Sequence, residues 1–399
     1  MNICYVNPTN NIRRPIAELA NILATQGHTI SIMYPSSQDC PTDNWVANQA
    51  IKNPKIKTIP IKSWYFAPLR YSLPNPIHLF QECKKALKEN DKIHVWEYYY
   101  PLSIMLVLLS AFNKQNRKKV ILTTDGFVGY SYKPKEPKWL VPAFKVYTNL
   151  FARLLFKIPS TLTTYGNPML PHAQKAGMPL HKLKVLSTGI HLQRFEKVDK
   201  DKTESIRKEF NLENNNNNNN KTEEKNNKNQ KVLLYIGMLT ERKRVHKVIE
   251  VSQALLEQGM NLKTILVGDA HGENIYTKLI KPEHQHNIIF AGGRKEIAEF
   301  MQIADALLLP SEGEGLPGVV MEAMASGLPV VATDEGCTPD LVTSGKEGFL
   351  VNDDNYLTPV KELLTNPQLN QQMRLAAREK IAQFSWDKVA QKYKEMYQD

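Results

Sequence analysis

The chain has 399 residues, 42% of them hydrophobic, and a formal net charge of +11. This length is long for one core and suits two domains of ordinary size. The four cysteines are far apart without C-x-x-C spacing, which argues against a disulfide framework and a zinc site. The first residues lack a signal peptide's charged segment and apolar run, and the longest apolar run, residues 101–112, is too short to span a bilayer. We therefore expect a cytoplasmic protein of two domains.

Basic residues are concentrated in the first half of the chain. Residues 1–190 contain 24 Lys and Arg against 9 Asp and Glu. Such a surplus favours an anionic partner, which is nucleic acid, a phospholipid surface or a pyrophosphate-linked acceptor. No nucleic-acid motif accompanies the charge, so we expect no nucleic-acid partner.

The first half alternates between short apolar runs and helical spacing. Residues 1–6 form an apolar run, and a polar loop, a helical pattern and a second apolar run at 29–33 follow. Further strands are expected at 92–96, 120–124, 161–164 and 184–187. This alternation predicts an α/β domain with a parallel, doubly wound sheet.

A second series of the same kind begins at Lys231. Strands are expected at 231–236, 263–267, 287–290, 304–309 and 330–333, with a helix at 245–258. The Asn-rich insert 213–230 lacks apolar residues to bury, which predicts a disordered surface loop. The expected domains are residues 1–190, with the C-terminal helix 384–399 added, and residues 191–383.

The most informative segment is residues 311–333, where Glu314 and Glu322 flank a Gly-Pro turn before a helix. Pro317 suits a helix entry, and the free N–H groups there attract phosphate. Two carboxylates can accept hydrogen bonds from sugar or ribose hydroxyls, so the segment suits a nucleotide-sugar. An exposed acidic loop before an amphipathic helix is the alternative interpretation.

Residues 314–331, EGLPGVVMEAMASGLPVV, resemble the E-x7-E motif of the retaining family 4 glycosyltransferases. The resemblance implies a GT-B fold, in which two Rossmann-like domains face a cleft and the C-terminal helix crosses back to the first domain. It implies a hexosyltransferase that moves a sugar from a UDP- or GDP-linked donor to a glycan or lipid-linked acceptor. No metal or other cofactor is expected. Alternatives are a non-catalytic nucleotide-sugar-binding protein and a GT-B epimerase.

The resemblance also implies roles for donor-side residues. Glu314 would contact the sugar near the anomeric carbon as a catalytic residue, and Glu322 would bind the ribose. The donor-binding set is completed by residues that follow the expected strands: Gly237, Arg242, Lys243, Gly268, Gly315, Leu316 and Pro317. Lys243 is the expected phosphate cation, and Arg242 or Arg244 would replace a family arginine where this chain has Met238. A solvated basic helix start is the other interpretation of this run.

In the first half, Asp125 occupies the place of a family histidine that lies near the reacting sugar. It would bind the donor sugar or an acceptor hydroxyl as a second catalytic residue, or it would only cap a turn. Arg13 and Arg14 stand where the family has a Gly-rich turn, and would bind phosphate on the acceptor side or begin a solvated helix. Asp199 and Asp201 form a D-x-D pair in a Lys-rich linker, which we do not interpret as a metal site.

Two segments of the first half set apolar residues among lysines, at 62–66 and at 138–157. The second has helical spacing and predicts a helix that lies in a membrane headgroup region or packs onto the domain's own sheet. The charge asymmetry favours the membrane, with the protein peripheral at its inner face and the acceptor presented there.

Overall fold

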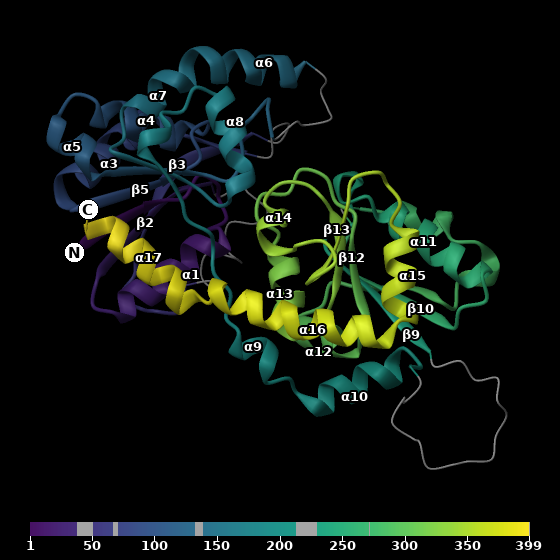
Figure 1. Ribbon diagram of the computed structural model, residues 1–399. Coiled ribbons are helices and arrows are strands. Elements are labelled where there is room, and N and C mark those ends of the chain that lie inside the picture. Colours follow the sequence, from purple (N-terminus) through teal and green to yellow (C-terminus); the bar gives the residue numbers. More distant parts are fainter. Residues whose placement is uncertain (38–50, 67–70, 132–138, 213–229, 271, 399) are drawn as a thin grey trace. The chain divides into compact units, whose positions relative to one another are not determined.

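The computed structural model describes residues 1–37, 51–66, 71–131, 139–212, 230–270 and 272–398 (Figure 1). Within it the chain forms two compact units. The first contains Met1–Gly189 and Trp386–Asp399, and the second contains Ile190–Ser385. The Asn-rich insert, except its last residue, lies outside the described residues.

The first unit contains an eight-stranded sheet with the strand order β4-β3-β2-β1-β5-β6-β7-β8. All neighbours are parallel except β3 and β4, which pair antiparallel. The strands are β1 Asn2–Val6, β2 Thr29–Ser36, β3 Lys57–Phe66, β4 Tyr71–Pro74, β5 Lys92–Trp96, β6 Val120–Thr124, β7 Thr161–Thr164 and β8 Leu183–Val185. The chain builds outward from β1 in one direction and then returns to add β5 on the other side. The topological switch point of this sheet therefore lies between β1 and β5.

The helices of the first unit follow the expected alternation with the strands. They are α1 Arg14–Thr25, α3 Pro76–Glu89, α4 Pro101–Ser110, α5 Lys114–Lys119, α6 Leu140–Tyr147, the π-helix η2 Thr148–Ala152, α7 Arg153–Lys157, η3 Asn167–Met169, α8 Leu170–Lys175, η4 Leu180–Lys182 and α17 Trp386–Gln398. Asn75 caps α3 by accepting from the amides of Ile77 and His78, and Pro76 supplies a preset φ at the first helical position.

The C-terminal helix α17 is an integral part of the first unit. The buried ring of His94, on β5, lies between the Tyr397 hydroxyl at 2.6 Å and the Thr123 hydroxyl at 2.5 Å. Burial lowers the pKa of His94 to about 3, so this ring stays neutral in the core. The side chain of Trp386 packs over Gly189, where an added Cβ would meet the indole ring at 2.5 Å.

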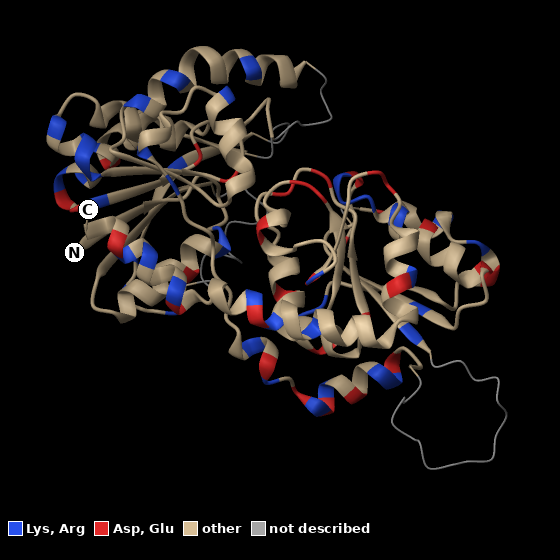
Figure 2. Ribbon diagram, viewed as in Figure 1, with Lys and Arg blue, Asp and Glu red and all other residues tan. Residues whose placement is uncertain are grey.

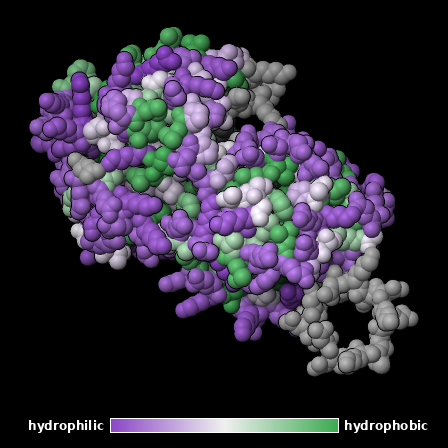
Figure 3. Space-filling model, in the orientation of Figure 1, coloured by the Kyte–Doolittle hydropathy of each residue, from purple (hydrophilic) through white to green (hydrophobic). Residues whose placement is uncertain are grey.

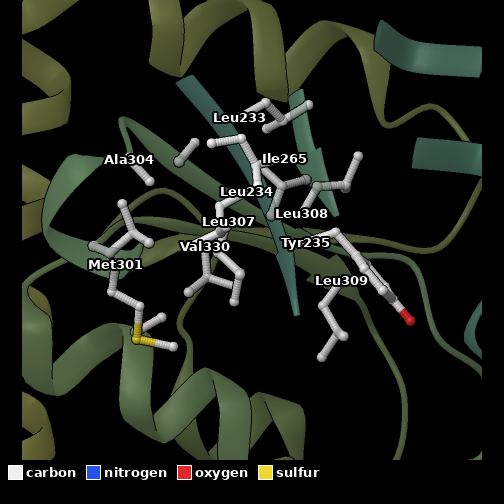
Figure 4. Packing of buried hydrophobic residues seen from close by; sticks show 14 of the residues in the cluster. Leu233, Leu234, Tyr235, Ile265, Met301, Ala304, Leu307, Leu308, Leu309 and Val330 are labelled. Carbon is white, nitrogen blue, oxygen red and sulfur yellow. The ribbon is translucent and has the colours of Figure 1, made fainter. Parts of the chain in front are cut away.

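The second unit contains a six-stranded, wholly parallel sheet with the order β11-β10-β9-β12-β13-β14. Its strands are β9 Lys231–Ile236, β10 Leu262–Val267, β11 Ile288–Gly292, β12 Ala306–Leu309, β13 Val330–Thr333 and β14 Gly348–Val351. Figure 4 shows the apolar side chains of its central strands packed with those of the covering helices, as expected for a parallel sheet covered on both faces. The switch point of this sheet lies between β9 and β12.

The helices of the second unit cover its sheet. They are α9 Gln193–Glu196, α10 Lys200–Glu209, η5 Glu241–Lys243, α11 Val245–Glu257, η6 Ile275–Leu279, η7 Pro282–His284, α12 Ile297–Ile303, α13 Gly318–Ser326, α14 Thr338–Leu341, α15 Leu357–Thr365, α16 Pro367–Ile381 and η8 Ala382–Phe384. Asp199 accepts hydrogen bonds from the amides of Asp201 and Lys202 and so caps α10. The D-x-D pair is therefore a helix start.

Candidate active site

The predicted site residues gather at the switch points of the two sheets. In the second unit, Arg242 and Lys243 follow β9, and Glu314 follows β12. In the first unit, Arg13 lies in the loop after β1, and Glu97 follows β5 directly. Ligands of open parallel sheets bind at such positions, beyond the carboxyl ends of the strands.

Two cations converge on Glu314 in the second unit. The Nζ of Lys243 lies 2.5 Å from Glu314 Oε1, and Nη1 of Arg242 lies 3.2 Å from the same oxygen. Arg242 also donates to the backbone carbonyls of Glu312 and Gly313, at 3.1 and 3.2 Å. Burial by itself would raise the pKa of Glu314, but Lys243 and then Arg242 outweigh it and hold this pKa below its ordinary value. The carboxylate is therefore charged at neutral pH and holds both cations in place.

Arg244, the second candidate arginine, pairs with other side chains, and its Nε lies 3.5 Å from Glu312 Oε1. It donates to Asp354 at 2.5 Å, and its guanidinium lies over the Tyr356 ring at 5.9 Å. Its φ of +50° is left-handed, a conformation that favours glycine. Arg242, and not Arg244, stands beside Lys243 and Glu314.

The loop that carries Glu314 is held by its neighbours on both sides. The amide of Glu312 donates to the Arg242 carbonyl at 2.9 Å, and that of Cys337 donates to the Gly315 carbonyl at 2.8 Å. Gly336 has a φ of +60°, and an added Cβ would lie 1.8 Å from the Glu314 carbonyl oxygen. Only glycine fits there, so the position of Glu314 depends on the loop after β13.

Helix α13 begins directly after this loop, with Pro317 as its first flanking residue. The side chain of Leu316 packs against the core, which anchors the helix entry. Glu322 lies on α13 and is 9% exposed. The first-turn N–H groups of a helix point outward from its N-terminus and attract anions. The structure thus places the start of α13 at the same sheet edge as Arg242 and Lys243.

Gly268 directly follows β10 and lies beside the loop after β9. Its φ is +146°, and a Cβ there would lie 1.9 Å from the carbonyl oxygen of Gly237. The two predicted glycines therefore mark a close approach of two backbones. Asp269 accepts a hydrogen bond at 2.7 Å from the amide of Gly293, so it joins two loops rather than capping the next helix, which Asn274 caps.

In the first unit, Arg13 connects two carboxylates. Its Nη1 lies 2.7 Å from Glu97 Oε1, and its Nη2 donates to Asp125. Asn7 shapes the loop, because its Oδ1 accepts from the Arg13 amide at 3.0 Å. The side chains of Arg13 and Asp125 are 26% and 29% exposed, so the cluster reaches the surface. Arg14 lies next to the cluster in the chain and is exposed on the first turn of α1.

Glu97 was not predicted from the sequence. It is 1% exposed, adopts a left-handed φ of +59°, and accepts from the Thr124 hydroxyl at 2.8 Å. Burial, and then the nearby charge of Asp125, raise its pKa to about 8. The available signal was a glutamate directly after an apolar strand, at an edge where parallel sheets present functional groups.

Over the parts of the chain that the structure describes, no three or more His, Cys, Asp or Glu side chains are grouped so as to hold a metal ion.

Comparison with known proteins adds to this geometry. Residues 216–380 match the family model for glycosyl transferases group 1. N-acetyl-alpha-D-glucosaminyl L-malate synthase of Bacillus anthracis is 30% identical over 176 residues, which are 43% of this chain and 46% of that protein. The residues that match this family model lie within the second unit.

The solved structure of Anabaena HepE in complex with UDP covers 99% of both chains with a TM-score of 0.73, at 16% identity. This likeness shows the fold, which is GT-B, as predicted. The glycosyl transferase match includes Lys243, Glu314 and Glu322, whereas Arg13, Glu97 and Asp125 lie outside it. Lipopolysaccharide 1,2-N-acetylglucosaminetransferase of Salmonella typhimurium is 27% identical over 182 residues, 41% of this chain and 47% of that protein. The chain thus spans about half the length of these curated relatives.

Proposed function

We propose that this protein is a retaining glycosyltransferase that moves a sugar from a UDP- or GDP-linked donor to a glycan or lipid-linked acceptor. The observation that carries the proposal is the group of Arg242, Lys243 and Glu314 at the switch point of the second sheet, with the start of α13 beside it. Two cations and a helix N-terminus form a site for a diphosphate. The match of residues 216–380 to the group 1 glycosyl transferase model, the similarity to an N-acetylglucosaminetransferase and the UDP complex of HepE support this choice.

In the proposed reaction, the bond between the anomeric carbon and the donor phosphate breaks, and its electron pair goes to the phosphate oxygen. Lys243, Arg242 and the α13 start stabilise the resulting charge without a metal or other cofactor. The acceptor hydroxyl oxygen bonds to the anomeric carbon on the same face, and its proton passes to the leaving phosphate. Glu322 accepts hydrogen bonds from the ribose, and Glu314 from the sugar.

Glu314 has a second role in the donor-free protein. Its carboxylate forms ion pairs with Lys243 and Arg242, so it competes with a diphosphate for these two cations. When the donor binds, the phosphates replace the carboxylate on Lys243 and Arg242, and Glu314 is released toward the sugar hydroxyls. Pre-positioned cations limit the side-chain entropy that is lost on binding.

On the acceptor side, we assign the cluster of Arg13, Glu97 and Asp125 to the recognition of an acceptor hydroxyl or phosphate. Asp125 is the exposed carboxylate of the cluster, and Arg13 both orients it and supplies positive charge. Arg14 adds a second positive charge beside it. The protein would act in the cytoplasm, where nucleotide-sugars are its substrates.

The test begins with native mass spectrometry of the protein mixed with a panel of UDP- and GDP-linked sugars. The donor that binds is then incubated with the protein without acceptor, and release of the nucleoside diphosphate is followed with and without EDTA. We expect one donor class to bind and to be hydrolysed equally in both conditions. Binding without hydrolysis, even after an acceptor panel is added, would favour the non-catalytic binding protein. No binding of any donor would remove the proposal.

A further inference from the structure

The helical segment formed by α6, η2 and α7 has two apolar faces. On the inner face, Thr148, Ala152, Leu155 and Phe156 are buried in the first unit. The outer face presents large apolar side chains to solvent at spacings of seven and four residues, which is one face of a helix: Trp139 (66% exposed), Val146 (59%), Leu150 (70%) and Leu154 (59%). The helix therefore packs onto its own domain through the inner face, and its outer face carries exposed apolar side chains.

The charged residues of this helical segment are all basic. Residues 139–157 contain Lys145, Arg153 and Lys157, all exposed, and no Asp or Glu. Figure 2 shows this helix without acidic residues, and Figure 3 shows apolar surface along the edge of the first unit where it lies. Long basic side chains can extend beside such a face to reach phosphate groups while apolar side chains are submerged.

The inner face fastens this helix to the candidate acceptor site. The Tyr147 hydroxyl donates to the carbonyl of Tyr98, at 2.6 Å, and Tyr98 directly follows Glu97. The Thr148 hydroxyl donates to the carbonyl of Val128, at 3.0 Å, in the loop that begins with Asp125. The outer face is thus connected through one helix to both loops that carry the carboxylates.

Charge decides which partner fits this face. A second copy of the chain, related by a two-fold axis, would place this positively charged surface against the same surface of its partner. The lysines and arginines of the two copies would then repel each other. An anionic bilayer offers an apolar interior for the exposed apolar side chains and negatively charged headgroups for the basic ones. No helix in the described part of the chain is long and apolar enough to cross a membrane, so contact would be made in the plane of the headgroups.

We propose that the outer face of residues 139–157 binds an anionic phospholipid surface, with Trp139, Val146, Leu150 and Leu154 inserted among the headgroups. The proposal rests on the function proposed above, since it explains how a lipid-linked acceptor would reach the cluster of Glu97 and Asp125. Its test is independent of turnover.

The test is flotation of the full chain with phosphatidylglycerol-containing vesicles and with pure phosphatidylcholine vesicles. The double variant Leu150→Glu with Leu154→Glu should bind the anionic vesicles at least tenfold more weakly than wild type. The matched control is Leu375→Glu on α16 of the second unit, because Leu375 is 59% exposed, as Leu154 is. It should bind like wild type. Replacing Lys145, Arg153 and Lys157 singly with Gln should weaken binding roughly fivefold each, and high salt should weaken it further.

Brominated phospholipids locate the contact. Quenching of tryptophan fluorescence should be lost in Trp139→Phe and kept in Trp64→Phe, since Trp64, 59% exposed on β3, is the other exposed tryptophan among the described residues. Wild-type vesicle binding by the double variant, or loss of quenching in Trp64→Phe only, would overturn the proposal. So would a soluble dimer that the double variant dissociates. Donor hydrolysis without vesicles should be equal in wild type and double variant, so vesicle binding by a protein without hydrolysis would contradict the proposed function alone.

Discussion

The pair of Lys243 and Glu314 leads to two variants with opposite effects on nucleotide binding. Lys243→Ala removes a cation from the diphosphate site, and Glu314→Gln removes the carboxylate that occupies the same cations. If the phosphates replace Glu314 on Lys243 and Arg242, the first variant should weaken binding of UDP or GDP. The second should strengthen it, although Glu314→Gln should lower donor turnover severely.

The magnitude follows from the burial of the pair. The side chains of Lys243 and Glu314 are 15% and 13% exposed, so solvent screens their interaction less than it screens a surface ion pair. A charge-assisted hydrogen bond of this kind contributes roughly 1.5 to 3 kcal/mol. Loss of about 2 kcal/mol corresponds to a roughly 30-fold weaker diphosphate affinity for Lys243→Ala. A gain of roughly tenfold is expected for Glu314→Gln, because the neutral amide oxygen can still accept weaker hydrogen bonds from the two cations.

Titration calorimetry with UDP and GDP measures both effects. The matched control is Lys361→Ala, whose ammonium group pairs with Gln258 at the C-terminal end of α11. That position precedes β10 and lies at the opposite edge of the sheet from the site, so its affinity should equal that of wild type. Unchanged affinity in Lys243→Ala would move the phosphate site elsewhere. Equal weakening by both variants would show that Glu314 supports diphosphate binding and does not compete with it.

Three further variants extend the account. Glu322→Gln should lower donor turnover with the fold intact, since it removes a charge-assisted hydrogen bond worth roughly 1.5 to 3 kcal/mol, and wild-type turnover would exclude Glu322 from the site. In Glu97→Gln the pH dependence of stability should change. Because the pKa of Glu97 is raised to about 8, the stability it provides is complete below its ordinary pKa and is lost as the pH rises through 8. The melting temperature of the variant relative to wild type should therefore rise between about pH 5 and about pH 8, and parallel curves would refute the assignment. Gly336→Ala should cost more than about 2 kcal/mol in urea unfolding, because its Cβ meets the Glu314 carbonyl, whereas Gly345→Ala, with a φ of +85° and open space around it, should cost only about 1 to 2 kcal/mol of backbone strain. Equal costs would show that the contact does not constrain the loop.

The central strands could be predicted from the sequence because burial on both faces makes them continuous apolar runs. Residues 231–236, for example, form β9 as expected. Strands β3, β4 and β14 were not predicted, and β3 and β14 show the physical reason. β3 alternates between buried and exposed positions and contains Pro60, and β14 has only four residues and starts with Gly348.

The grouping of Arg242, Lys243 and Glu314 could be expected because these residues follow two of those central strands. Only part of the cluster in the first unit could be predicted from the sequence. Arg13 and Asp125 were identified, but their contact joins residues 112 positions apart, and Glu97 joins them through a long-range hydrogen bond network. No local pattern reports which carboxylate will face which arginine, since the sheet order that brings β1, β5 and β6 together is a property of the whole unit.

The helix at 139–157 shows a different limit of sequence patterns. Apolar residues that recur at helical spacing indicate a helix. They do not indicate which face of the helix is buried when both faces are apolar. Of the residues predicted to form one stripe, Leu155 is buried, whereas Leu150 and Leu154 are exposed. The structure assigns the faces because Tyr147 and Thr148 have hydrogen-bond partners in the first unit.

The central claim is that the site at the β9 and β12 switch point transfers a sugar with retention of configuration. Proton NMR of a reaction with the identified donor and an acceptor reports the anomeric configuration of the first product formed. The account predicts a product with the donor's configuration for wild type and Lys361→Ala, and almost no product for Glu314→Gln. An inverted product, or full turnover by Glu314→Gln, would contradict it.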